Sequence, residues 1–526
     1  MTCGRQTVLC NRLEFMKIVV WSFLIFVLTG PSCQSIPKNF NATPSYHFLD
    51  TENTYWGKYF AKEIKSKKDQ SGFHPLVAGT DALVARLESI RHAEKSLDVQ
   101  YYIWHDDDTG KLMLSEIIKA ADRGVRVRLL LDDLNIGKYQ DSLLVIDSHP
   151  NIEVRMFNPF ANRTWRIFEV FRFGEINRRM HNKSLIADNQ TVIIGGRNIG
   201  NEYFTASSEA NFGDFDVWCF GPVVKEASQS FDLYWNDRLA IPIAELYKRS
   251  LRPEDLSQLK EALNADAKSL AASEYQKSLN EAPLSVFLKT EKLKTFWGRG
   301  KIVSDSPAKI RGDENAGPPL NQVTGLPIKS QKEIFIVSPY FIPGKNGVDY
   351  FAKKVKAGVQ VDVFTNSLAS NDVGLVFAGY KKYRKGLIKA GVRLYEMKPK
   401  VRIPQGSKSR MGITSAGRLG LHGKVYIFDR RVMFVGSMNL DPRSVDLNSE
   451  LGVLIESPEL ADLFVTNLKR EMSELAYRVT LDEKNKLRWE TREDDQDVVL
   501  TSEPEASGWK TFTSGFLGLF VPESLL

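Results

Sequence analysis

The sequence predicts an α/β fold made of two similar halves, each with a mixed, largely parallel sheet flanked by helices. The chain has 526 residues, which is about three and a half times the roughly 150 residues expected of one domain. Its 43% hydrophobic and 26% charged residues are typical of folded domains and exclude wholesale disorder. Strand-like and helix-like stretches follow one another in the same order twice along the chain, which indicates a duplication.

The N-terminal segment, residues 1–35, is predicted to be a signal or a membrane anchor. Its apolar run from Ile18 to Leu28 follows Lys17 and is short for a membrane span, as in the hydrophobic region of an export signal. Small residues then lead into Cys33, as in a bacterial lipoprotein signal, although Leu28 lies further from Cys33 than in the usual pattern. Two modes of attachment stay open, an uncleaved signal anchor and a lipidated Cys33.

The first half is expected to form a domain over residues 73–245. Alternating apolar residues indicate strands, and a glycine, Gly124, precedes the central one. The expected elements are a strand over 97–103, a helix over 112–121, a strand over 125–131 and a strand over 152–157. A polar, helix-prone linker over residues 246–283 follows, with leucines spaced for one apolar face.

The second half is expected to repeat this order over residues 284–485. Its expected elements are a strand over 334–337, a helix over 348–356, a strand over 359–364 and a strand over 392–395. Glycines and prolines are dense over residues 298–330, which predicts irregular loop. The last segment, residues 486–526, ends in an apolar tail that could dock on the protein or lie in a membrane interface.

The charge of the chain is unevenly distributed. Lysine and arginine number 71 against 64 acids, a net charge of +7. Eleven of these basic residues but only one acid lie between Lys381 and Arg410, so this segment carries +10 and the rest of the chain −3. A solvated surface and a site for an anionic partner, either phosphate-bearing lipid or nucleic acid, are both open interpretations.

Two of the seven histidines begin the same extended pattern, one in each half. The offsets from the histidine are +2, +7, +14, +15 and +17 in both copies. The first copy is His181, Lys183, Asp188, Gly195, Gly196 and Asn198, and the second is His422, Lys424, Asp429, Gly436, Ser437 and Asn439. Two chance copies of six aligned positions at corresponding places are implausible, so we expect the two copies to act together.

The spacing predicts a strand, a turn and a return strand after each histidine. Strand alternation places the histidine and the lysine on one face, and the hairpin brings the later residues back beside them. In the first copy Gly196 would leave room for a bulky anion and Asn198 would donate to it. Ser437 and Asn439 would do so in the second.

Two such surfaces facing each other would form one phosphodiester site without a metal. One imidazole can attack phosphorus to give a covalent phosphohistidine while the other protonates the leaving alkoxide. The lysines and asparagines would neutralise the non-bridging oxygens. The second imidazole would then activate an alcohol or water. Because no metal-ligand spacing is found among the cysteines or histidines, we expect no metal and no cofactor.

Carboxylates are needed to hold the far nitrogen of each imidazole. Asp214 is the candidate beside the first copy, with Asp216 as the less favoured choice, and Glu450 is the candidate beside the second. Asp188 and Asp429 are kept as catalytic candidates within the motifs, although turn capping is the favoured interpretation of both.

These residues resemble the phospholipase D superfamily, whose duplicated HxKxxxxD motif both copies match. Within it the chain is most similar to bacterial cardiolipin synthases of the shorter, export-signal-bearing type. The supporting residues are Arg197 and Tyr203 after the first motif, Arg443, Ser444 and Asn448 after the second, and Ser338 to Pro343. The resemblance implies two phospholipase D-like domains with one active site at their interface. It also implies a phosphatidyl-histidine on His181, with His422 as general acid and base.

We therefore expect a membrane-associated enzyme that transfers a phosphatidyl group to an alcohol or to water. Its expected partners are the membrane surface and glycerophospholipids, phosphatidylglycerol and phosphatidylethanolamine among them. An arginine and aromatic stretch over residues 163–179 suits such an interface, although a packed helix with solvated arginines explains it as well. The expected location is a bacterial cell envelope, with a secreted or host-membrane-targeted form as an open alternative.

Two other functions are alternatives. The first is a metal-independent nucleic-acid phosphodiesterase, which the basic segment could serve but which the export signal and the apolar tail disfavour. The second is a non-catalytic lipid-binding protein, which two intact motifs disfavour.

Overall fold

The computed structural model describes residues 36–506 apart from short gaps. The gaps are residues 38–39, 41, 137–138, 163–168, 170–171, 248, 272, 291–292, 314–315, 317–324, 327–328, 402–416 and 494–495. The predicted signal, Cys33, the apolar residues of the tail and the end of the basic segment therefore lie outside the described residues. In the part of the chain that the structure describes, no helix has the length and hydropathy needed to cross a membrane.

The first half is a mixed sheet covered by helices, as the sequence predicts. Its strands are β1 (Ser71–Leu76), β2 (Ser96–Tyr101), β3 (Arg126–Asp132), β4 (Ile152–Phe157), β5 (Ser184–Ala187), β6 (Thr191–Gly195), β8 (Asp216–Phe220) and β9 (Ala240–Pro242). The strands β2, β3 and β4 are parallel, and β5, β6 and β8 continue the sheet antiparallel from β2. The helices are α2 (Tyr55–Ser66), α3 (Gly79–Arg91), α4 (Asp108–Asp122), α5 (Gln140–Asp147), α6 (Phe173–Ile176), α7 (Pro222–Trp235) and α8 (Ile243–Leu246).

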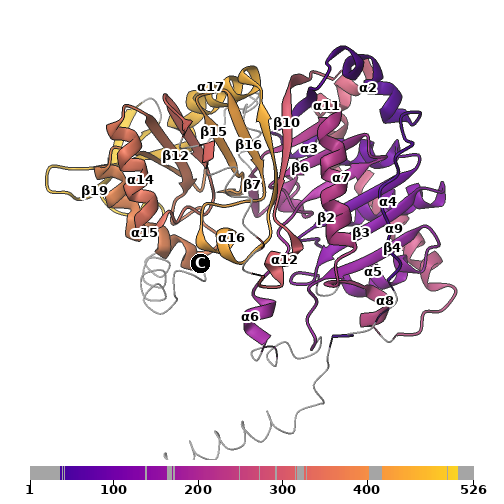
Figure 1. The fold of residues 1–526 in the computed structure, drawn as a ribbon. Coiled ribbons are helices and arrows are strands. Elements are labelled where there is room, and N and C mark those ends of the chain that lie inside the picture. The colour runs from indigo at the N-terminus through magenta and orange to yellow at the C-terminus, as the bar shows by residue number, and fades with distance from the viewer. Residues whose placement is uncertain are drawn as a thin grey trace, which may run out of the picture.

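The second half repeats this topology. Its strands are β11 (Glu333–Val337), β12 (Gln360–Asn366), β13 (Arg393–Met397), β15 (Val425–Phe428), β16 (Val432–Gly436), β17 (Leu451–Glu456), β18 (Ala476–Leu481), β19 (Leu487–Glu493) and β20 (Gln496–Leu500). Again β11, β12 and β13 are parallel, and β15, β16 and β17 follow antiparallel. The helices are α12 (Pro307–Ile310), α14 (Gly344–Lys356), α15 (Gly374–Lys389), α16 (Pro442–Asp446) and α17 (Pro458–Leu475). Figure 1 shows the two halves side by side, with α14 and α15 on the outer side of the second.

The helices between the halves pack on the first half. They are α9 (Asp255–Ala271), α10 (Glu274–Asn280) and α11 (Pro283–Thr290). Helix α9 contacts α4, and α10 and α11 contact α3. The leucine-lined face expected of the linker therefore packs on the first half: Leu263 is buried in its core, and Leu251 and Leu259 are partly buried against it.

The expectation of irregular loop after residue 298 is wrong at its start. Residues Phe296–Ser304 form strand β10, which pairs with β1 of the first half and with β17 of the second. Its glycines are required by close packing: a Cβ at Gly298 would lie 2.2 Å from the Glu456 carbonyl oxygen, and one at Gly300 2.8 Å from the Phe73 ring. Strand β10 thus joins the two sheets into one.

The sheet of the second half extends past residue 485, where the sequence analysis places the start of the last segment. Strand β19 pairs with β18, and β20 pairs with β19, so the sheet continues to Leu500.

A second junction brings the ends of the two halves together. Strand β7 (Ala210–Gly213) runs parallel to β14 (Arg418–Leu421), and a single bridge joins Met180 to Ser449. A core cluster spans the same junction, with Ile194 and Val217 from the first half and Val425 and Val435 from the second. This junction positions both histidine motifs.

Candidate active site

Both motif histidines precede the first strand of their hairpin and lie at the junction of the two halves. His181 comes before β5 and His422 before β15, and each residue is only 8% exposed. The charges of Lys183, Lys424 and His422 act on His181, so the two motifs share one site. The hairpin turns are as predicted: Asp188 and Asn189 have positive φ, as do Asp429 and Arg430.

Each imidazole is held by a carboxylate of the other half. His181 Nδ1 lies 2.8 Å from Glu450 Oε2, and His422 Nδ1 lies 2.6 Å from Asp214 Oδ2. The sequence-based assignment of each carboxylate to the copy in its own half is therefore wrong. Asp216, the less favoured choice, instead binds the buried Arg86 at 2.9 Å.

The backbone explains the crossing. The His422 amide donates to the Gly213 carbonyl at 2.8 Å, directly before Asp214, because β14 runs beside β7. The His181 amide donates to the Ser449 carbonyl at 2.9 Å, directly before Glu450. The segment that leads into each histidine thus pairs with the segment that ends in the other half's carboxylate.

The motif lysines are buried beside the histidines. Lys183 Nζ donates to the His181 carbonyl at 2.6 Å, and Lys424 Nζ donates to the His422 carbonyl at 2.5 Å. Burial lowers the pKa of Lys183 well below its usual value and brings the pKa of Lys424 to about 8. An arriving phosphate would favour the charged form of both lysines.

The two histidine pairs differ electrostatically. Burial would raise the pKa of Asp214, but the charge of His422 and its hydrogen bond bring it to about 2. Burial instead dominates at Glu450 and raises its pKa to about 7, although Lys183 opposes this. Burial, followed by the Lys183 charge, lowers the pKa of His181 well below its usual value. The pKa of His422 is also lowered by burial, but Asp214 counteracts the change.

The predicted phosphate-binding residues have more specific partners than the sequence indicated. Ser437 Oγ donates to Glu450 Oε2 at 2.5 Å, and Asn198 Nδ2 donates to the Tyr203 hydroxyl at 3.1 Å. Asn439 Oδ1 is buried and has no hydrogen-bond partner among the described residues. At Gly196 a Cβ would lie 2.2 Å from Asp214 Oδ1, so the glycine makes room for that carboxylate.

The two motif aspartates do not take part in the site. Asp188 accepts hydrogen bonds from the backbone amides of residues 94, 95 and 96, and Asp429 accepts them from residues 331, 332 and 333. Each aspartate ties the hairpin turn to the start of the neighbouring parallel strand. Their inclusion among the catalytic candidates is therefore corrected, and the capping interpretation is retained.

Two aromatic residues border the histidines: Tyr102, which the sequence analysis missed, and Tyr203, which it named only for the family resemblance. The Tyr102 ring meets the His181 ring edge-on with centroids 4.9 Å apart, and Tyr203 meets His422 in the same way at 5.2 Å. Tyr102 directly follows β2, where the carboxyl end of a parallel strand borders the site. The place of Tyr102 at the carboxyl end of a parallel strand could have indicated from the sequence that it borders the site.

The arginines before the first motif are partly structural. Arg179 is fully buried and pairs with Asp132, with Nη2 2.6 Å from Oδ1, and Asp132 also accepts from the Met180 amide at 3.0 Å. Arg179 therefore fixes the segment before His181 and does not face a lipid headgroup. Residues 163–168 lie outside the described residues.

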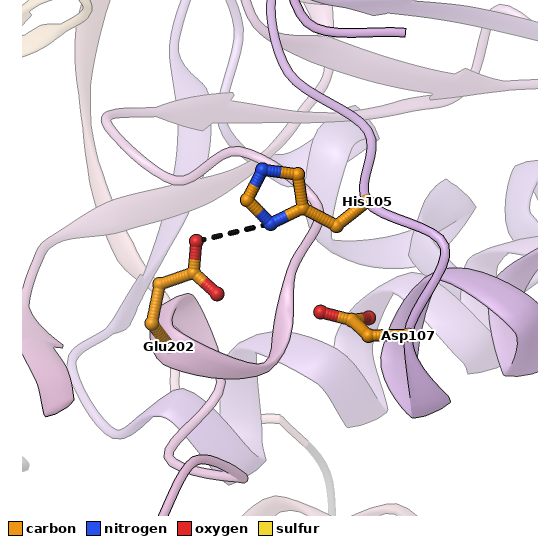
Figure 2. Close-up of side chains that lie close together, drawn as sticks. All are labelled: His105, Asp107 and Glu202. Carbon is orange, nitrogen blue, oxygen red and sulfur yellow. Dashed lines mark ion pairs between the residues drawn. The ribbon is translucent and has the colours of Figure 1, made fainter. Parts of the chain in front are cut away.

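One group of side chains has the composition of a metal site. His105, Asp107 and Glu202 offer ligand atoms within 4.8 Å of one another, and it is the one such group in the part of the chain described. Figure 2 shows both carboxylates beside the His105 ring, with Glu202 3.2 Å from Nδ1. Asp107 already caps α4 through the Gly110 amide at 3.0 Å and binds the Asn201 amide at 2.7 Å. None of the three belongs to a histidine motif.

Comparisons with known proteins agree with this architecture. The family model described as "Cardiolipin synthase, PLD-like domain" matches residues 87–235 and 327–472, one copy in each half. Cardiolipin synthase C of Escherichia coli (strain K12) is 39% identical over 455 residues, which cover 84% of this chain and 93% of that protein. An uncharacterized Helicobacter pylori (strain J99) protein is 34% identical over 87% of this chain and 90% of its own length.

A solved structure shares the fold. The phosphatidylserine synthase of Haemophilus influenzae Rd KW20 superposes with a TM-score of 0.51 at 16% sequence identity, and the match covers 89% of this chain and 99% of that one. The duplicated α/β arrangement thus occurs in a protein of distant sequence.

Proposed function

The chain belongs to the cardiolipin synthase, PLD-like family of the phospholipase D superfamily, and we propose that it is a phosphatidyltransferase acting through a covalent phosphatidyl-histidine. The observation that carries this proposal is the pair of buried histidines, each held by a carboxylate of the opposite half and each beside a buried lysine. Relatives named as cardiolipin synthases support a glycerophospholipid as the substrate.

In the first step His181 is the nucleophile. Its pKa is lowered well below the usual value, chiefly by burial, so the ring is neutral and its Nε2 lone pair can form the bond to phosphorus. The bond between phosphorus and the headgroup oxygen breaks, and His422 gives its proton to the leaving alkoxide. Asp214, with a pKa of about 2, stays ionised and supports the protonated form of His422. Glu450 stabilises the positive charge that develops on His181.

In the second step the roles reverse. Neutral His422 accepts the proton of an incoming alcohol or water, whose oxygen attacks phosphorus while the bond to His181 breaks. With the glycerol headgroup of phosphatidylglycerol as the alcohol, the product is cardiolipin; with water, it is phosphatidic acid. Lys183 and Lys424 balance charge on the non-bridging oxygens in both steps.

We also propose the finer features of this function. The phosphatidyl donor is phosphatidylglycerol or phosphatidylethanolamine, and the enzyme works at a bacterial envelope membrane, attached through residues 1–35 by a signal anchor or a lipidated Cys33. The apolar run from Ile18 to Leu28 and the cardiolipin synthase relatives support this location.

Product analysis tests the proposal. Full-length protein in detergent micelles receives labelled phosphatidylglycerol or phosphatidylethanolamine, with and without added glycerol. We expect cardiolipin, a transphosphatidylation product or phosphatidic acid. Cleavage of DNA without any lipid turnover would contradict the proposal and favour the nucleic-acid phosphodiesterase.

A further inference from the structure

We propose that Lys309 is a positioning residue whose charge keeps the Glu450 carboxylate ionised beside His181, while Asp305 holds Lys309 and the Glu450 backbone in place. This inference rests on the two-histidine reaction proposed above. The two halves of the chain differ at the residues that contact Glu450 and Asp214.

The two halves support their carboxylates with different residues. The register of β1 on β8 pairs Leu76 with Asp216, and the register of β10 on β17 pairs Val303 with Gly452. Since β8 and β17 hold equivalent places beside β6 and β16, Asp305 and Lys309 occupy the positions of Ala78 and Ala82 in the first half. The pair therefore has no counterpart at the equivalent positions of the first half.

The first half has its cation elsewhere. Arg197 is buried, donates to the Asp214 carbonyl at 2.8 Å and lies 3.3 Å from Asp216. The motif offset gives Met438 as its counterpart in the second half, and Gly452 as the counterpart of Asp216. Each carboxylate that holds a histidine thus has an acid and a cation next to it. The acid and the cation come from different positions of the repeat in the two halves.

The contacts of the second pair lead directly to the active site. Lys309 Nζ donates to Asp305 Oδ2 at 3.0 Å and to the Ser444 carbonyl at 3.0 Å. The same Asp305 oxygen accepts from the Glu450 amide at 2.9 Å, and the Asp305 amide donates to the Glu450 carbonyl at 3.0 Å. Lys309 is 9% exposed, and Asp305 and Glu450 are each 3% exposed, so this network is closed to solvent.

The charge of Lys309 favours ionisation of Glu450, which burial makes unfavourable. Two carboxylate oxygens, Asp305 Oδ1 and Glu450 Oε1, are buried without a hydrogen-bond partner among the described residues. Burial raises the pKa of Glu450 to about 7, and the charges of Lys183 and Lys309 oppose that rise. Without Lys309, more of the Glu450 population would be protonated at neutral pH and unable to stabilise positive charge on His181.

Several other groups also face Glu450. The charged or titratable groups that interact with the Glu450 carboxylate are Lys183, Lys424, His181, Asp305 and Asp441. The hydroxyls of Tyr102, Tyr234 and Tyr426 also interact with it. Of the two cations that lower its pKa, Lys183 belongs to the first histidine motif and donates to the His181 carbonyl, whereas Lys309 contacts Asp305.

The test is the pH dependence of phosphatidyl transfer in full-length variants. Lys309→Met removes a positive charge near Glu450, which should raise the pKa of that carboxyl. We therefore expect the acid limb of the kcat profile to move to higher pH by about one unit. Lys309→Arg should restore the profile of the unchanged protein. Asp305→Asn should move the acid limb downward, because it removes a negative charge beside Glu450. If Lys309 and Asp305 had a purely structural role, Lys309→Met and Asp305→Asn would lower activity equally at all pH values.

Lys398→Met is the matched control. Lys398 is 6% exposed, but its Nζ lies over the Tyr477 ring at 5.6 Å. Burial lowers the pKa of Lys398, and the charges of Glu493, Glu505 and Glu474 counteract this. Its pH profile should not shift. An unshifted acid limb in an active Lys309→Met protein would overturn the inference and leave the proposed function intact. Absence of lipid turnover in the unchanged protein would instead count against the proposed function, and NMR titration of His181 with and without Lys309→Met would still test the inference.

Discussion

At the scale of single residues, the site depends on two contacts that cross between the halves. His181 is held by Glu450 and His422 by Asp214, at 2.8 and 2.6 Å. A substitution in one half should therefore act on the histidine of the other. The sequence indicated which residue types were needed, but not this exchange, because a hairpin motif describes only its own half.

Loss of either histidine should abolish turnover. We expect His181→Ala and His422→Ala each to lower kcat by about 1,000-fold or more, since nucleophile and acid act as one unit. Phosphatidyl transfer in micelles measures the effect. His92→Ala is a suitable control, because His92 is 35% exposed beside Glu88 on α3. Full activity in the double variant would mean that the motifs do not perform the chemistry.

The ionised Glu450 carboxylate should promote catalysis but lower the stability of the folded protein. Its folded-state pKa of about 7 lies above the ordinary 4.5, so the folded protein holds this proton more tightly and loses stability as pH rises from about 4.5 to about 7. Glu450→Gln should remove that loss while lowering kcat. Melting temperatures at pH 5 and pH 8 check this: the drop between the two should be smaller in the variant. An equal or larger drop would contradict the role of burial at this carboxylate.

At the scale of elements, the sequence predicted the parallel strands and the motif hairpins of both halves, but it did not predict strand β10, which joins the two sheets. The strands over residues 97–103 and 334–337 follow from alternation, and the structure has β2 and β11 there. Strand β10 was interpreted as loop because Gly298 and Gly300 are turn-forming residues in isolation. Only the approach of Glu456 and Phe73 shows why glycine is needed.

Gly298→Ala should weaken the joint between the sheets. A Cβ there would meet the Glu456 backbone at 2.2 Å, and backbone cannot move aside as a side chain can. We expect a loss of about 1–3 kcal/mol in the free energy of unfolding, as for other overpacked positions. Chemical denaturation measures it. Gly386→Ala on α15, whose Cβ would meet Val348 at an ordinary 3.5 Å, should not destabilise the protein, and equal losses in both variants would refute the argument.

At the scale of the whole molecule, duplication produced one site from two incomplete halves. Each half contributes a histidine and a lysine to its own motif and a carboxylate to the opposite one. The basic segment is likewise divided by the fold: Arg384 is buried against Glu396 at 2.9 Å, while Lys381, Lys382, Lys385 and Lys389 of α15 are exposed. Net charge alone could not separate these roles, because it carries no information on burial.

The exposed lysines of α15 should contribute to binding of anionic membranes. Replacing Lys381, Lys382, Lys385 and Lys389 by glutamine should weaken sedimentation with phosphatidylglycerol vesicles by about tenfold or more, since each basic residue near such a surface contributes about 1 kcal/mol. The matched control replaces Lys58, Lys62, Lys65 and Lys67 of the α2 region, which are also exposed. Equal effects of both sets would assign the attraction to net charge and not to α15.

The central claim is that the phosphatidyl group passes through His181, and rapid quenching followed by mass spectrometry tests it most directly. Full-length protein and its His422→Ala variant are mixed with phosphatidylglycerol, stopped within milliseconds to seconds and digested. We predict a phosphatidyl adduct on the peptide that contains His181. In His422→Ala the adduct should form more slowly, because the leaving alkoxide is not protonated, and should last longer once formed, because water or alcohol is no longer activated. An adduct on the His422 peptide, or turnover with no adduct on either peptide, would contradict the account.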